Sequence, residues 1–99
     1  MSTGTNMARQ AAHDKIESQI KITQAKLETL KAKAESAKAT TELKLIADLL
    51  TKKQAIDRKL NELKKSSETA YQQAKADIES RVAELKKSVQ AIEMKFKAA

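Results

Sequence analysis

The chain has 99 residues, enough for one small domain, and no cysteine, which excludes disulfide bonds, thiolate catalysis and cysteine-ligated metals. It has one Tyr, one Phe and no Trp. Large aromatics normally anchor a specific binding pocket, so we expect no small-molecule substrate and no cofactor. The formal net charge of +7 would instead attract nucleic acid, an anionic membrane or an acidic protein.

The sequence also argues against export and membrane insertion. Residues 1–15 are polar, and the most apolar stretch, residues 43–50, contains Lys44 and Asp48. That stretch is far shorter than the roughly 20 residues that a membrane span needs, and no secretory signal precedes it. We therefore expect a soluble, cytoplasmic protein.

Residues 1–6 are predicted to form a short disordered tail, in which Thr5 or Asn6 caps the helix that follows. Residues 7–99 then form a single helical coiled-coil domain, since the only glycine is Gly4 and there is no proline. The first helix carries a heptad seam whose members are three and four residues apart. These members are Ile16, Ile20, Thr23, Leu27, Leu30, Ala34, Ala37 and Thr41.

A break near residues 39–42 would separate this helix from the next, with Thr40 or Thr41 as the cap. The seam runs straight into that region without a glycine or proline, so an unbroken helix is the alternative. The following segment is apolar over a wide arc, because two seams lie side by side on it. One contains Leu43, Ile46 and Leu50, and the other contains Leu45, Leu49, Ile56, Leu60 and Leu63.

A reversal is predicted near residues 65–68, where two lysines are followed by Ser66, Ser67 and Glu68. Cations suit the end of one helix, and serines cap the next. A third seam follows, from Tyr71 through Ile78 and Val82 to Phe96. The predicted core comprises Leu27, Leu30, Leu49, Ile56, Leu60, Leu63, Leu85, Val89 and Ile92.

The fold class is therefore all-α, either an antiparallel coiled-coil hairpin or a three-helix bundle. The wide apolar arc of residues 43–63 must be covered from two sides. With both breaks, that segment is the middle helix of a bundle. With only the later reversal, it lies in a hairpin that pairs with a second chain.

No residue constellation predicts catalysis, so we expect no enzyme and no catalytic or metal site. His13, the only imidazole, is one turn from Glu17, but no further ligand completes a metal site, and a solvated histidine is the simpler interpretation. Four acids precede a lysine or arginine by four residues, as Asp48 precedes Lys52 and Asp77 precedes Arg81. Such pairs stabilise exposed helices.

The favoured function is a non-catalytic structural or protein-interaction module. The alternative is a basic module that binds nucleic acid or membrane phosphate electrostatically. Lysines outnumber arginines, are spread along the chain and lack interleaved aromatics, which disfavours specific nucleic-acid recognition.

Association is expected if the chain reverses only once. The returning helix would then cover half of the first helix and leave an apolar stripe exposed. We would expect a homodimer, or a contact with another helical protein, unless a break near Thr40 folds the stripe inward. The candidate interaction residues are Ile16, Ile20, Leu27, Leu30, Leu43, Ile46 and Leu50.

Two stretches, QIKITQAKLETLKAKAESAKA at residues 19–39 and AYQQAKADIESRVAELKKSVQAI at residues 70–92, resemble a group of small bacterial coiled-coil proteins of uncharacterised function. The resemblance implies a long first helix, a short break and a shorter returning helix with an aromatic at its start, a place that Tyr71 would take. Ser66 and Ser67 stand where the group often has a glycine. The resemblance implies no functional residues.

Overall fold

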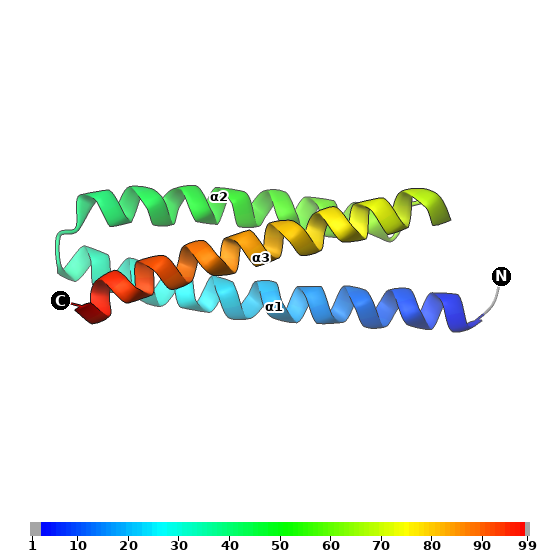
Figure 1. The fold of residues 1–99 in the computed structure, drawn as a ribbon, viewed down its shortest axis with the longest axis horizontal. Helices are drawn as coiled ribbons and strands as arrows, with labels where there is room; N and C mark the ends of the chain where they lie inside the picture. The colour runs from blue at the N-terminus through cyan, green and yellow to red at the C-terminus, as the bar shows by residue number, and fades with distance from the viewer. Residues whose placement is uncertain (1–2, 99) are drawn as a thin grey trace.

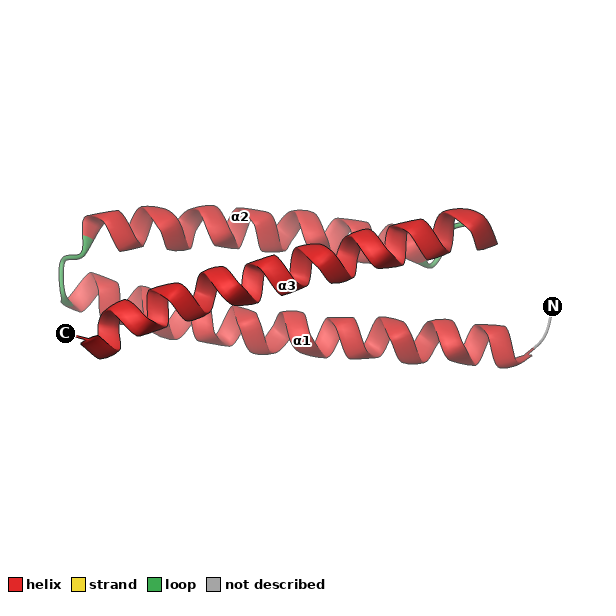
Figure 2. Cartoon of the chain, in the orientation of Figure 1, coloured by secondary structure: helices red, strands yellow, loops and turns green. Residues whose placement is uncertain are grey.

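The computed structural model describes residues 3–98, and this part of the chain is helical except at two short turns. Helix α1 spans Thr3–Ser36, α2 spans Thr40–Leu63 and α3 spans Glu68–Ala98. They lie side by side in a rod of 54 × 17 × 16 Å (Figures 1 and 2). Each helix packs against the other two. Of the two predicted architectures, the chain therefore adopts the three-helix bundle.

The helices alternate in direction, as short connections require. Figure 1 shows α2 returning along α1, and α3 running back so that the C-terminus lies near the α1–α2 turn. Ion pairs fix the register of α3 at both ends of the rod. Arg9 of α1 meets Glu68 at 2.8 Å, and Lys95 meets Glu42 of α2 at 3.8 Å.

The core is a thin column of aliphatic side chains along the axis of the bundle. All nine residues predicted for it are buried, with Leu27 fully inaccessible and Val89 1% exposed. The heptad spacing explains this, because three- and four-residue steps keep a side chain on one face of a helix. Of the wide apolar arc on α2, Ile46 and Leu49 are buried, whereas Leu45 is 41% exposed. Helices α1 and α3 both pack against α2, so the arc is covered from two sides as predicted, and Leu45 lies at its exposed edge.

The α1–α2 turn is closed by backbone hydrogen bonds rather than by a side-chain cap. The Ala39 N–H donates to the Ala34 carbonyl at 2.8 Å, and the Lys38 N–H donates to the Glu35 carbonyl at 3.2 Å. These are the two bonds of a Schellman motif, and Lys38 takes its left-handed position with φ 55°. The turn satisfies the Ala34 and Glu35 carbonyls of α1 without a glycine.

The prediction for this turn was right in kind and wrong in position. The helices break at residues 37–39 rather than 39–42, and α2 begins at Thr40 after Ala39, which makes no side-chain cap bond. Threonine capping therefore does not start α2. Helix α1 instead ends where its core seam ends. Ala34 is the last core residue of that helix, and the backbone hydrogen bonds of the turn form directly after it.

The α2–α3 turn uses the serines expected there. The Ser66 hydroxyl donates back to the Glu62 carbonyl at 3.3 Å, and the Ala70 N–H donates to the Ser67 hydroxyl at 3.4 Å. The second bond makes Ser67 the N-cap of α3. Glu68 then lies in the first turn, where its charge complements the helix dipole.

The predicted tail is wrong where the structure describes it. Residues 3–6 belong to α1, so neither Thr5 nor Asn6 caps a later start. Met1 and Ser2 lie outside the described residues. Once a helix is nucleated by packed turns, each added residue gains a hydrogen bond, so cap-type residues alone do not end it.

Candidate functional site

The residues predicted to mediate association lie inside the bundle. Ile16, Ile20, Leu27, Leu30 and Ile46 are at most 3% exposed, while Leu43 and Leu50 are partly buried against the same core. The expectation of a homodimer through them depended on a single reversal. Because the chain also breaks at residues 37–39, its own helices cover this stripe, and it is no free surface.

His13 is buried, with only 6% of its surface exposed, so the interpretation of a solvated histidine is wrong. The sequence contained the signal, because His13 lies three residues before Ile16 and continues the heptad seam. Its Nδ1 lies 3.5 Å from Asp14 Oδ1 and 3.6 Å from Glu17 Oε2 and makes no hydrogen bond. The histidine therefore acts as the outermost layer of the core rather than as a placed ligand.

Arg9 fastens the start of α1 to the α2–α3 turn. Its guanidinium lies over the Tyr71 ring, with Cζ 4.2 Å from the ring centroid. Nη1 donates to the Ser66 carbonyl at 3.1 Å, and Nη2 donates to Glu68 at 2.8 Å. These groups border an open hollow of about 400 Å³ beside His13. The turn and Glu68 occupy Nη1 and Nη2, whereas Nε is buried without a hydrogen-bond partner among the described residues, and through the two bonds the guanidinium holds this end of the bundle together.

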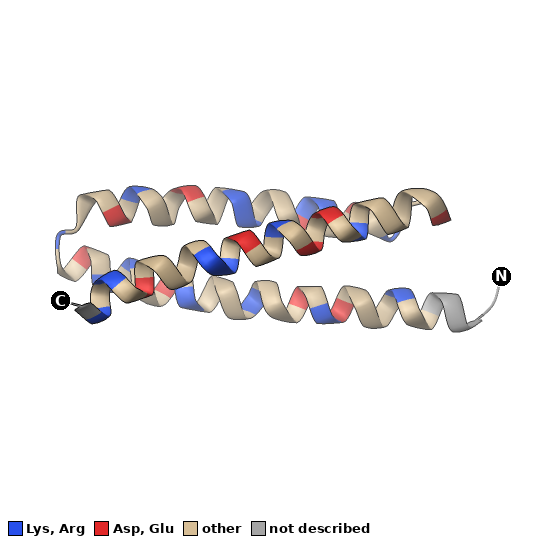
Figure 3. Ribbon diagram, viewed as in Figure 1, with Lys and Arg blue, Asp and Glu red and all other residues tan. Residues whose placement is uncertain are grey.

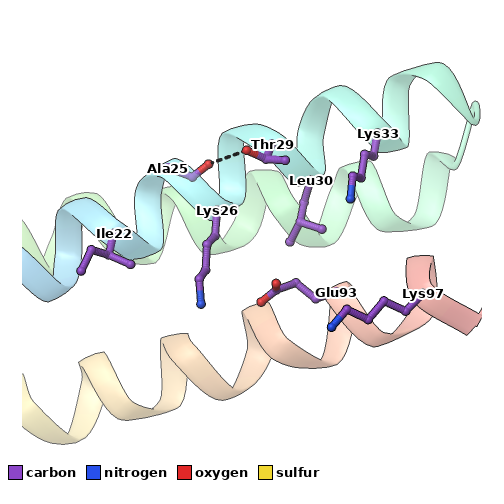
Figure 4. A pocket seen from close by; sticks show the side chains of 8 residues that line it. All are labelled: Ile22, Ala25, Lys26, Thr29, Leu30, Lys33, Glu93 and Lys97. Carbon is purple, nitrogen blue, oxygen red and sulfur yellow. Dashed lines mark hydrogen bonds between the residues drawn. The ribbon is translucent and has the colours of Figure 1, made fainter.

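A second surface lies between α1 and α3, and we name it the α1/α3 groove. It consists of two adjoining hollows of about 350 and 190 Å³ that share Ile22 and Lys26. Ile22 is 55% exposed, although it is among the most apolar residue types. Figure 4 shows Ile22, Lys26 and Leu30 on one wall, from α1, with Glu93 and Lys97 on the other wall, from α3.

Cations dominate the rim of this groove. Basic and acidic residues are interspersed along all three helices (Figure 3), yet four lysines border the groove against one acid, Glu93. Among residues 3–98, none of the four takes part in an ion pair. They are Lys26, Lys33, Lys86 and Lys97.

The corresponding hollow between α2 and α3 differs in its electrostatics. It is bordered by Lys52 and Arg81, and both pair with acids on their own helices, at 3.7 Å to Asp48 and 3.0 Å to Asp77. The hydrogen bond from Arg81, together with the charges of Arg81 and Lys59, holds the pKa of Asp77 below its ordinary value. The cations of the α2/α3 hollow are therefore neutralised locally, unlike the four lysines of the α1/α3 groove.

Ile22 is not a member of the heptad seam predicted for α1, and the groove was not predicted from the sequence. A weak signal was present, because Ile22, Lys26, Thr29 and Lys33 repeat at the heptad spacing beside the core seam. That second row borders a groove only once α3 is known to lie next to α1. Periodicity within one helix cannot show which neighbour flanks it.

The described residues form neither a cluster of metal ligands nor a membrane-spanning helix. Within the described part of the chain, no three His, Asp or Glu side chains gather in a way that could hold a metal ion. Between residues 3 and 98, no helix combines the length and apolar character needed to cross a bilayer. What the geometry presents is an elongated, partly apolar groove with a basic rim, on a narrow three-helix bundle.

Comparisons of the chain with protein-family models, with curated proteins and with solved structures each found no match.

Proposed function

We propose that this chain is a non-catalytic protein-interaction module, a cytoplasmic three-helix bundle that binds a helix of another protein in its α1/α3 groove. The observation that carries the proposal is the position of Ile22. When a partner covers a large aliphatic side chain that is half exposed in a groove, the burial of apolar surface contributes favourably to the free energy of binding. The core is already closed, so stability of the bundle does not require Ile22.

Helical geometry favours a helix as the partner. Two roughly parallel helices form a groove along their axes, and a third helix laid into such a groove packs by the knobs-into-holes contacts of a coiled coil. Grooves of this kind bind amphipathic helices through anchors three and four residues apart. The heptad row of Ile22, Lys26, Thr29 and Lys33 offers a matching surface.

The proposal is tested by site-specific photo-crosslinking in the native cell. One photo-reactive residue replaces Ile22, and a matched one replaces Leu45, which is also exposed but lies outside the α1/α3 groove on α2. We expect a discrete protein adduct from position 22. Absence of protein adducts from both positions would contradict an interaction function.

The alternative is electrostatic binding to nucleic acid or to an anionic membrane, and the net charge of +7 favours it. Binding of this kind falls steeply as salt rises from low to physiological concentration, because condensed counterions are released. A titration of duplex DNA and of anionic vesicles over that range separates the two functions. Tight, salt-sensitive binding without protein adducts would replace the proposal with this alternative.

A further inference from the structure

The α1/α3 groove also carries information about the chemistry of its partner. We infer that it selects an acidic amphipathic helix, one with an aliphatic seam flanked by Asp or Glu. This inference rests on the proposed function and deepens it, because it specifies the class of helix that would bind.

The apolar part of the groove determines which residues the partner helix needs on the face that it buries. Ile22, Ala25 and Leu30 from α1 line the larger hollow, and Val89 from α3 lines the smaller one. Leu30 and Val89 belong to the core, so the floor of the groove is continuous with the interior of the bundle. An aliphatic side chain seated there extends the core rather than opening a new contact.

The rim sets the charge of the partner. Lys26 and Lys33 border one side, and Lys86 and Lys97 border the other, with Glu93 as the only acid. A helix in the groove would bring its flanking positions next to these lysines, as in the charge pairing between helices of a coiled coil. Acidic residues at those positions would be attracted from both sides, whereas basic residues would be repelled.

The length of the groove sets the size of the partner. Its wall on α1 runs from Gln19 to Lys33, which corresponds to about 21 Å at the rise of an α-helix. A partner segment of about four turns would fill it. Shorter segments are marginal helices in water and would lose affinity through the entropy of ordering.

The same charges argue against two other occupants. A second copy of this chain would bring a net charge of +7 to a groove that is already basic. Nucleic acid would find phosphate contacts along the rim, but the groove has neither an aromatic side chain nor an arginine with which to stack bases, and its apolar floor would stay uncovered.

The test uses the full chain and two synthetic helical peptides of about 18 residues, enough for five turns. Both have the same leucine seam, but one is flanked by Glu and the other by Lys. We expect the Glu-flanked peptide to bind at least about tenfold more tightly by fluorescence anisotropy, and this preference to shrink at high salt. Equal binding of the two peptides would overturn the charge selectivity.

Variants locate the binding. Ile22→Ser should weaken binding of the Glu-flanked peptide about tenfold or more, because it removes the exposed anchor. Leu45→Ser is the control variant on α2. The double variant Lys26→Glu/Lys97→Glu should reverse the preference between the two peptides. Lys44→Glu/Lys65→Glu changes the net charge equally, on exposed residues outside the groove, and should leave the preference unchanged.

Each result decides for or against the inference. Equal effects of the two double variants would show that net charge, rather than the groove, attracts the peptide. Dimerisation of the chain at micromolar concentration that Ile22→Ser abolishes would assign the groove to a second copy. A crosslink to protein from position 45 but not from position 22 would leave the interaction function standing and overturn the groove as its site.

Discussion

Leu27 and Ile22 stand one and a half turns apart on α1 in opposite environments. Leu27 is inaccessible to solvent, whereas Ile22 is 55% exposed. Leu27→Ala should therefore lower the free energy of unfolding by about 2–5 kcal/mol, since it leaves a cavity in the core. Ile22→Ala should cost less than about 1 kcal/mol. Urea unfolding of both variants measures the difference, and equal losses would contradict the observed core.

Arg9 should not tolerate exchange for lysine. Its guanidinium stacks on Tyr71 and bonds both the Ser66 carbonyl and Glu68, and an ammonium group cannot make this planar set of contacts. We expect Arg9→Lys to lower the free energy of unfolding by about 1–2 kcal/mol, with the charge kept. Arg58→Lys on the exposed face of α2 is the matched control. Equal behaviour of the two variants in thermal unfolding would show that only the charge matters.

At the scale of the helices, a substitution in the α1–α2 turn should increase the stability of the bundle. Lys38 adopts φ 55°, which costs a residue with a Cβ about 1 kcal/mol relative to glycine. Lys38→Gly should therefore stabilise the bundle by up to about 1 kcal/mol. Lys31→Gly, within α1, should destabilise it by a similar amount because glycine is a poor helix former. The opposite signs of the two changes in denaturant midpoint check the turn geometry.

Asp77 links α3 to its surroundings in a pH-dependent way. Because the hydrogen bond from Arg81 and the charges of Arg81 and Lys59 lower its pKa in the folded state, this interaction contributes stability above the ordinary carboxyl pKa. That contribution is lost as the pH falls through the lowered value. NMR titration of the Asp77 carboxyl should give a midpoint below that of a model peptide, and Arg81→Gln should raise it. An unchanged midpoint in that variant would exclude the pairing.

The heptad spacing was sufficient to predict helices and most of the buried residues, although it left the number of breaks open and His13 was taken as solvated. Leu27, Leu85 and Ile92 belong to seams with three- and four-residue steps, which indicate the helix period directly. The sequence also indicated Ser67 as a helix cap. The sequence was not sufficient for the first turn, because a lysine at position 38 does not indicate a left-handed backbone. The candidate groove was out of reach for another reason, since Ile22 and Lys97 become neighbours only through the packing of α1 against α3.

At the scale of the whole molecule, the shape of the bundle and the distribution of its surface charge bear on where a partner could bind. Most of the large aliphatic residues lie in a narrow core, and the rod of 54 × 17 × 16 Å has a large surface relative to its volume. Part of that surface carries acids and bases in local pairs, such as Lys53 with Asp57 at 2.7 Å. The α1/α3 groove combines a half-exposed Ile22 with a rim of four lysines and one acid, and for this reason we propose it as the interaction site.

The two turns, at residues 37–39 and 64–67, have a consequence for the rate at which the chain acquires its structure. Each joins neighbours in sequence that are also neighbours in space, so most contacts close short loops, and the topology has low contact order. Helical proteins of this kind fold in microseconds to milliseconds. The chain also contains no proline, so it lacks the usual source of slow isomerisation. Temperature-jump relaxation should therefore follow one fast exponential, and a phase of seconds would point to an assembly step that the single bundle does not require.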